Sequence, residues 1–186
     1  MKQRNGVIKP SYNVQISVDE KEQFIVANEV TMECNDQHQL LPMVEQSKNN
    51  LGRLPHKVKA DCGYKSQLKL LLIKYPDIDI YIDDKNRLKE NFKIEDVMDK
   101  YDKISLDNLK KLLTDKGKKE YKKRMHTVEP PFGHLKFNLR YRNFLLRGFK
   151  NVRGEFNLMC IGFNLKKIWN FIQKNTLRLA EALKKC

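Results

Sequence analysis

Apolar and polar residues alternate near the start of the chain, and this pattern predicts a β-hairpin. Every second residue from Tyr12 to Val18 is apolar, a period of two that is typical of a half-buried strand. The polar run DEKEQ follows, and FIVANEVTM then predicts a second strand. We therefore expect two strands joined by a turn near Asp19–Lys21.

The next fifty residues predict two helices and two strands in alternation. Asn35 or Asp36 is suited to cap a helix that ends near Asn49. HKVKA then predicts a short strand ending at Asp61, SQLKLLLIKY a helix, and DIDIYID another strand. This order favours an α/β fold with helices packed against a sheet.

The second half of the chain is predicted to be mainly helical. Residues 84–128 are rich in lysine, so we expect an exposed, insertion-like segment that is either helical or partly loose. Residues 129–175 then form the C-terminal helices. The two prolines of VEPPFG are placed in a first helical turn, where a missing N–H costs nothing. The apolar spacing in the last helix predicts that it is largely buried, Trp169 and Phe171 included. The length of 186 residues fits one domain, 1–186.

Charge is distributed unevenly and points to a polyanionic partner. The chain has 37 basic and 23 acidic residues, a net charge of +14. Residues 1–84 carry 11 basic and 12 acidic side chains, whereas 136–186 carry 12 and 2. In the last segment arginines alternate with aromatic residues, a mixture suited to phosphate neutralisation and base stacking. Nucleic acid is therefore the expected partner, although a solvated basic face over an aromatic core would give the same pattern.

Other classes of protein are disfavoured by composition. No apolar run approaches the roughly 18 residues of a membrane span, and no signal peptide is recognisable at the N-terminus. The four cysteines are far apart and form no CxxC pair, which argues against a zinc knuckle or a disulfide framework. We expect reduced thiols in a cytoplasmic protein.

Two carboxylates are candidates for chemistry. Asp61 ends a predicted buried strand, and Glu129 lies at the head of a predicted helix. Carboxylates that converge in space can hold Mg²⁺ and activate a water or a hydroxyl group at a phosphodiester. From spacing alone, a strand-end aspartate and a helix-starting glutamate in structural roles are the simpler interpretation.

Several separated motifs resemble one family in the order in which that family has them. YNVQISVDEKEQFIVANEVT, NDQHQLLPMVEQ, ADCGY, VEPPFGHLK and FLLRGFKNVRGEFNLMCIGFNLKKI closely resemble the C-terminal catalytic part of bacterial insertion-sequence transposases of the DDE superfamily. The resemblance implies an RNase H-like (retroviral-integrase-like) fold, a mixed sheet with flanking helices. It also implies that Asp61 and Glu129 are catalytic residues and ligands of Mg²⁺ or Mn²⁺.

The region around Glu129 also resembles the Tyr–Arg–Glu–Lys signature of the insertion-sequence-four type, with one departure. Four residues separate the arginine from the glutamate, where the signature usually has three. The resemblance implies contacts of Arg124 and Lys136 with DNA phosphates. Arg147 and Arg153 lie in the strongest family-like stretch and either bind DNA or pair with Glu155. The residues proposed to bind DNA are Tyr121, Arg124, Lys136, Arg147 and Arg153.

The family's first catalytic aspartate has no counterpart in this chain. In the family it lies on the first strand, shortly before a stretch resembling MKQRNGVIKPSYN, with which this sequence begins. We do not expect Asp19, Glu20 or Asp36 to replace it. The chain is therefore interpreted as an N-terminally truncated domain that lacks the first strand.

The function implied by the resemblance is DNA transposition. The complete family member cuts and joins DNA strands by metal-dependent phosphoryl transfer, and this fragment is expected to bind DNA but to be inactive alone. One alternative is a non-catalytic DNA-binding remnant that modulates full-length transposase, and another is an unstable relic without a role. The expected partners are DNA (transposon ends and target) and either a second copy of the chain or a full-length transposase.

Overall fold

The N-terminal hairpin forms as the alternation predicts. The computed structural model describes residues 11–88 and 92–183, with side chains as far as position 176 except at 88. Strands β1 (Asn13–Val18) and β2 (Ile25–Thr31) are antiparallel. The backbone N–H of Asp19 donates to the Phe24 carbonyl over 2.9 Å and closes the turn.

A second, parallel pair of strands follows. Helix α1 (Leu40–Leu51) leads to β3 (Lys57–Ala60), and β4 (Asp79–Ile82) lies beside β3. The 3-10 turn η1 (Cys62–Gln67) and helix α2 (Leu68–Lys74) connect them. The predicted order of elements is confirmed, and the fold is mixed α/β, but the described strands form two two-stranded sheets.

The start of α1 differs from the prediction. The N-cap is Gln39, and no side chain caps this end of the helix. Asn35 instead accepts a hydrogen bond from the Gln37 N–H in the preceding loop. The Asp36 carboxylate accepts hydrogen bonds from two side chains of β1 and is therefore turned away from the helix.

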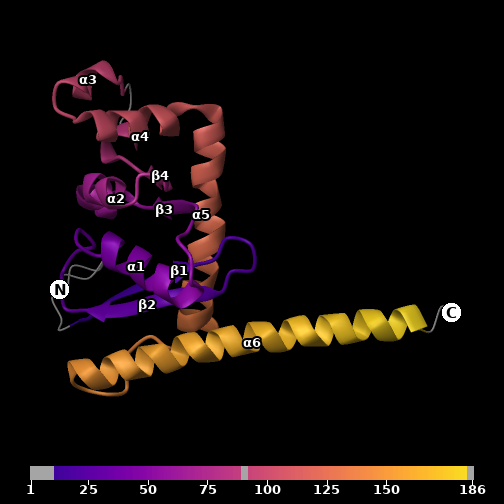
Figure 1. Ribbon diagram of the computed structural model, residues 1–186. Coiled ribbons are helices and arrows are strands. Elements are labelled where there is room, and N and C mark those ends of the chain that lie inside the picture. The colour runs from indigo at the N-terminus through magenta and orange to yellow at the C-terminus, as the bar shows by residue number, and fades with distance from the viewer. Residues whose placement is uncertain (1–10, 89–91, 184–186) are drawn as a thin grey trace.

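The lysine-rich region contains well-packed helices. After the short η2 (Lys85–Leu88) and α3 (Glu95–Met98), helix α4 (Lys103–Leu113) buries Leu109 and Leu112 completely. Helix α5 (Asp115–Gly133) then runs down one side of the molecule and contacts β1, β3 and β4 (Figure 1). The predicted boundary at residue 128, between the lysine-rich segment and the C-terminal helices, falls inside α5.

The two prolines lie in the last turn of α5, so their predicted place in a first helical turn is wrong. Pro130 has no N–H to donate to the carbonyl of His126, four residues earlier. The side-chain amide of Gln23, in the hairpin turn, donates to that carbonyl over 2.8 Å. A tertiary contact thus replaces the missing helical bond. The π-helical turn η3 (His134–Asn138) extends α5 to the chain reversal.

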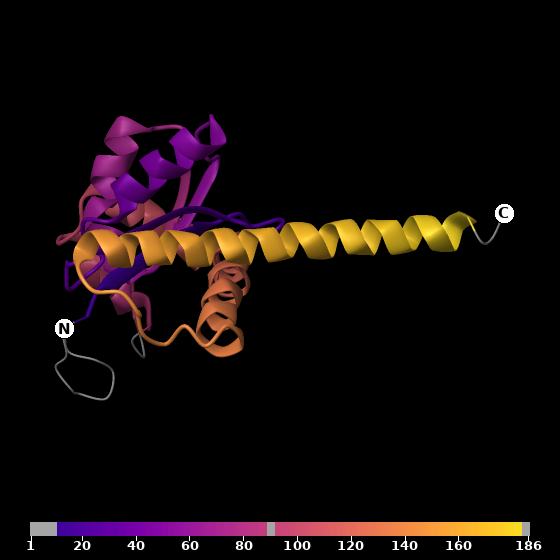
Figure 2. The ribbon, with the colours of Figure 1, turned by 90° about the horizontal axis from the view of Figure 1, so that it is seen from below.

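The last helix, α6 (Phe149–Leu183), is 35 residues long and crosses below the hairpin (Figure 1). Its first half packs on β2, and its second half projects beyond the rest of the molecule (Figure 2). The prediction of a largely buried helix is therefore wrong: Trp169 and Phe171 are each 61 % exposed. The helix carries two apolar stripes, and the body of the protein covers only one.

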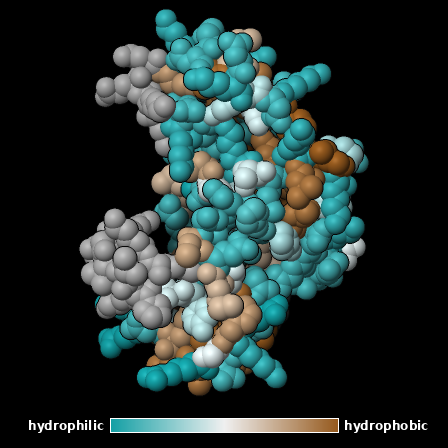
Figure 3. Space-filling view, turned by 90° about the vertical axis from the view of Figure 1, so that its left-hand side faces the viewer, coloured by the Kyte–Doolittle hydropathy of each residue, from teal (hydrophilic) through white to brown (hydrophobic). Residues whose placement is uncertain are grey.

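Two hydrophobic clusters hold these layers together. One joins the hairpin to α6 through buried Ile25, Val30, Val152 and Phe156. The other surrounds β3 and β4 and includes side chains of α1 and α2. The outer face shown in Figure 3 is mainly hydrophilic with smaller apolar patches. Within the parts of the chain that the structure describes, no helix is long and apolar enough to cross a membrane.

Candidate functional site

A groove of about 1170 Å³ separates the two small sheets. Residues of β1 line one side and residues of β3 line the other, and among the described strands each is paired on one edge alone, β1 with β2 and β3 with β4. Helices α1 and α5 complete the walls. Its polar lining includes Asp36, Asp61, Arg124, Glu129 and Lys136.

Asp61 lies at the groove because β3 ends directly before it. Its carboxylate caps η1, with Oδ1 accepting a hydrogen bond from the Gly63 N–H over 2.8 Å. A Cβ at Gly63 would lie 3.0 Å from this oxygen and 3.5 Å from Oδ2 of Asp36. The absence of a side chain at Gly63 therefore lets two carboxylates, from distant parts of the sequence, face the same point.

Asp36 is held in place by strand β1. Its Oδ1 accepts hydrogen bonds from Asn13 Nδ2 over 2.7 Å and from Gln15 Nε2 over 2.6 Å. The side-chain oxygen of Gln15 accepts a hydrogen bond from the Tyr64 hydroxyl. Burial raises the pKa of Tyr64, and the charges of Asp36 and Asp61 raise it further. Tyr64 therefore stays a neutral donor beside the two acids.

The basic groups of the groove come from α5 and its extension. Arg124 Nε is buried and, among the described residues, has no hydrogen-bond partner, which leaves a donor free for an anion. Its guanidinium lies 5.6 Å from the Tyr121 ring centroid, and burial raises the pKa of Tyr121 to about 12. Glu129 is exposed on the same helix, and Lys136 follows in η3, 5.3 Å from the Phe132 ring centroid.

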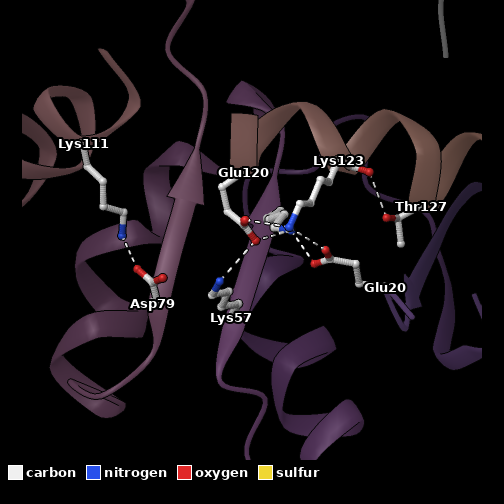
Figure 4. Close-up of polar contacts among 8 residues, drawn as sticks. Glu20, Lys57, Asp79, Lys111, Glu120, Lys123 and Thr127 are labelled. Carbon is white, nitrogen blue, oxygen red and sulfur yellow. Dashed lines mark hydrogen bonds and ion pairs between the residues drawn. The ribbon is translucent and has the colours of Figure 1, made fainter. Parts of the chain in front are cut away.

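An ion-pair cluster holds α5 against the strands (Figure 4). The carboxylate of Glu120 in α5 forms ion pairs with Lys59 of β3 over 2.9 Å, with Lys123 over 2.8 Å and with Lys57 over 3.2 Å. Lys59 also pairs with Glu20 of the hairpin turn. These contacts lower the pKa of Glu120 to about 2. The cluster connects both sheets to the helix that carries Arg124 and Glu129.

The remaining predicted site residues lie outside the groove lining. Arg147 is exposed in the loop before α6, and its carbonyl accepts a bond from Asn151. Arg153 pairs with Glu29 of β2 over 2.6 Å. Glu155 accepts the backbone N–H groups of Leu145 and Leu146, and among the described residues no ion pair joins it to either arginine.

The acidic groups do not form a complete metal centre. Among the described residues, no three His, Cys, Asp or Glu side chains are close enough to hold a metal ion. Asp36 and Asp61 supply the oxygen atoms that Mg²⁺ prefers, but each already accepts hydrogen bonds within the protein. Glu129 lines the same groove without joining this pair. The arrangement therefore does not fit a three-carboxylate metal site.

Sequence reasoning did not select Asp36 for this site. It lies 25 positions before Asp61, and its neighbours in sequence indicate a helix cap equally well. Its position depends on the packing of β1 against η1, through the buried Gln15. No local signal in the sequence specifies that contact.

Comparison with known proteins gave one match. Residues 84–169 match a family model described as a transposase DDE domain. The matched segment contains Tyr121, Arg124, Glu129 and Lys136 but not Asp61. Neither a search of curated proteins nor a search of solved structures found a significant match. The match supports a relationship to DDE transposases and suggests a role in transposition, and the mixed α/β fold is compatible with a DDE nuclease-like domain.

Proposed function

We propose that the protein belongs to the DDE transposases and acts in DNA transposition as a DNA-binding fragment of the catalytic domain. The observation that carries this proposal is the groove. It brings Asp61 together with Arg124, Glu129 and Lys136, which the sequence places more than 60 positions away. These are the residues to which the resemblance assigns metal binding and phosphate contacts. A cytoplasmic location is part of the same proposal.

The proposed DNA surface begins at the groove and continues along the loop that follows it. Lys136 and Phe137 line the groove, and the loop then exposes Arg140, Arg142 and Arg147. Exposed aromatic and aliphatic side chains lie between these arginines, among them Tyr141 and Leu145, the latter at 83 % exposure. Guanidinium groups neutralise phosphates, and aromatic faces stack on bases.

Fluorescence anisotropy with a labelled DNA duplex over a salt series tests this surface. Replacing Arg140, Arg142 and Arg147 together by Gln is expected to weaken DNA binding at least tenfold. It should also reduce the slope of the logarithm of the binding constant against the logarithm of the salt concentration by about 2 to 3, because each phosphate contact contributes about 0.9 to that slope. The matched control replaces Lys116, Lys118 and Lys119 by Gln at the opposite end of α5 (Figure 1). Equal losses in both variants would indicate only a net-charge effect and would contradict the proposed surface.

We propose an RNase H-like arrangement in which one further strand belongs between β1 and β3. Two strand edges that face one groove and have no partner strand within residues 11–88 and 92–183 support it, since exposed edges are normally paired or covered. Among the described residues, no three acidic, histidine or cysteine side chains gather to hold a metal ion. We therefore propose that these residues alone do not cut DNA.

A nicking assay on supercoiled plasmid with Mg²⁺ or Mn²⁺ tests this last point. The expected result is DNA binding without metal-dependent cleavage. Robust cleavage that Asp61→Ala abolishes, with DNA affinity unchanged, would overturn the proposed inactivity and establish Asp61 as a catalytic and metal-binding residue. Isothermal titration of Mn²⁺ into the wild type and into Glu129→Gln would measure whether Glu129 contributes to any metal binding.

The incomplete acidic group favours a second candidate function, a non-catalytic remnant that modulates full-length transposase. Such a remnant would occupy DNA or associate with the intact protein. Adding it to a transposition reaction should then lower the yield of joined product. The triple Arg→Gln variant separates the two routes, because it should relieve inhibition that depends on DNA occupancy and leave inhibition by protein association intact.

A further inference from the structure

Helix α6 carries an apolar stripe that nothing in the described part of the chain covers. Its five aliphatic residues are between 45 % and 70 % exposed. They are Leu158, Ile161, Leu165, Ile168 and Ile172. Single exposed apolar residues are common on protein surfaces, but a continuous stripe marks an interaction site.

The spacing of this stripe is the heptad spacing of a coiled coil. The intervals along the stripe are three, four, three and four residues, so its members occupy alternating a and d positions. The next interval of three leads to Asn175 and the following interval of four to Leu179, and the helical backbone reaches Leu183. The residues of α6 that pack on the hairpin, among them Val152, Phe156, Cys160 and Phe163, fall at the b, c and f positions. The heptad stripe is therefore on the side of the helix opposite the body.

The flanks of the stripe are uncharged from residue 157 to residue 176. The e and g positions there hold Asn157, Gly162, Asn164, Trp169, Phe171 and Thr176. The lysines of this part of the helix lie elsewhere: Lys167, at a c position, donates to the Glu22 carbonyl of the hairpin turn. A protein with a net charge of +14 can therefore bring two copies of this face together without opposing lysines at the contact. A polyanion would find no cation on it.

We propose that α6 forms a two-fold coiled coil with α6 of a second copy of this chain. A heptad stripe is self-complementary, because each a or d side chain fits between four residues of an identical facing helix. The second half of α6 projects away from the body (Figures 1 and 2), so a partner helix can lie along it. Burying the five aliphatic residues with Trp169 and Phe171 would remove roughly 600 Å² per copy, approaching the ~800 Å² of a standard interface.

This inference rests on α6 alone and does not depend on the proposed function. Mass measurement by light scattering across micromolar concentrations tests it. We expect the wild type to approach twice the 22.1 kDa of the single chain. Leu165→Lys with Ile168→Lys should weaken dimerisation about 100-fold or more, because it places like charges at the seam.

The matched control is Asn170→Lys with Gln173→Lys, which adds the same charge to exposed f and b positions of α6 outside the seam. It should dimerise as the wild type does. Because the replaced seam residues are exposed, the monomeric variant should keep the helical circular dichroism of the wild type at concentrations where both are monomeric. A wild type that stays monomeric, or a seam variant that dimerises as well as the control, would overturn the proposal. A monomer that binds anionic vesicles through this face would assign the stripe to a membrane surface instead.

Discussion

Replacing Glu120 by Gln should reveal how much the ion-pair cluster contributes to the stability of the fold. The Glu120 side chain is 13 % exposed and forms ion pairs with Lys57, Lys59 and Lys123. Its side-chain hydrogen bonds with Lys123 and Lys59 lower its pKa from 4.5 to about 2. Gln has nearly the same shape but no charge, so the substitution removes the ionic part of the cluster.

The magnitude follows from the pKa. A pKa shift of this size means that the charged form of Glu120 contributes about 3 kcal/mol to the free energy of unfolding at neutral pH, since each pKa unit is worth about 1.4 kcal/mol. Lys57 and Lys123 are about half exposed, so solvent screens their part of the interaction. We therefore expect Glu120→Gln to lower the free energy of unfolding by about 1–2 kcal/mol.

The effect should depend on pH with a definite sign. Folding lowers the pKa of Glu120 below its ordinary value of 4.5. The contribution of Glu120 to the free energy of unfolding is therefore complete above pH 4.5 and is lost as the pH falls toward 2. The difference between wild type and Glu120→Gln should shrink over this window. Glu20 has a lowered pKa as well and shares Lys59 and Lys123 with Glu120. Both lysines remain beside Glu20 in the variant, so part of the ionic cluster is kept there.

Urea unfolding followed by circular dichroism, repeated from pH 7 to pH 2, is the appropriate assay because urea does not screen charges. Asp107→Asn is the matched control. Asp107 is exposed on α4 and makes no hydrogen bond or ion pair with the residues that the structure describes; its loss should change stability by less than about 0.5 kcal/mol. A Glu120→Gln effect no larger than this control, or one that does not change with pH, would refute the reasoning.

Three further outcomes are expected. Gly117→Ala should destabilise the fold by at least about 2 kcal/mol, because the new Cβ would lie 1.9 Å from the Lys111 carbonyl oxygen; an unchanged thermal midpoint would contradict this. Thiol labelling with peptide mapping should modify exposed Cys34 in the native protein and Cys160 only after unfolding, since burial raises the pKa of Cys160 to about 12. Asn164→Ala should lower the free energy of unfolding by about 1–3 kcal/mol and speed hydrogen exchange in β2. The reason is that the Asn164 amide makes two hydrogen bonds to the backbone at the start of that strand.

Short-range patterns were sufficient for the first half of the chain. The alternation from Tyr12 to Val18 reports directly which side chains face the interior, and the polar run after it requires a turn. Asp61 was selected because it directly follows a strand, and β3 does end at Ala60. These features depend on neighbours within a few positions, so the local sequence is sufficient to predict them.

Two other features, the continuation of α5 and the convergence of two groove carboxylates, depended on contacts between distant residues. Pro130 looks like a helix start, but the side chain of Gln23 supplies the bond that lets α5 continue. The carboxylates of Asp36 and Asp61 meet because Gly63 leaves space between them. Neither contact has a signal in the local sequence.

The sequence by itself determined the α/β class, the hairpin, the order of strands and helices, and the concentration of positive charge in the last fifty residues. The tertiary structure decided that the strands form two sheets with a groove between them and that α5 joins both. It also decided which stripe of α6 is covered. Periodicity reports that a helix has an apolar face, but it contains no information on whether the hairpin, a second molecule or solvent meets that face. That choice is made by packing between residues more than a hundred positions apart, as between Ile25 and Asn164.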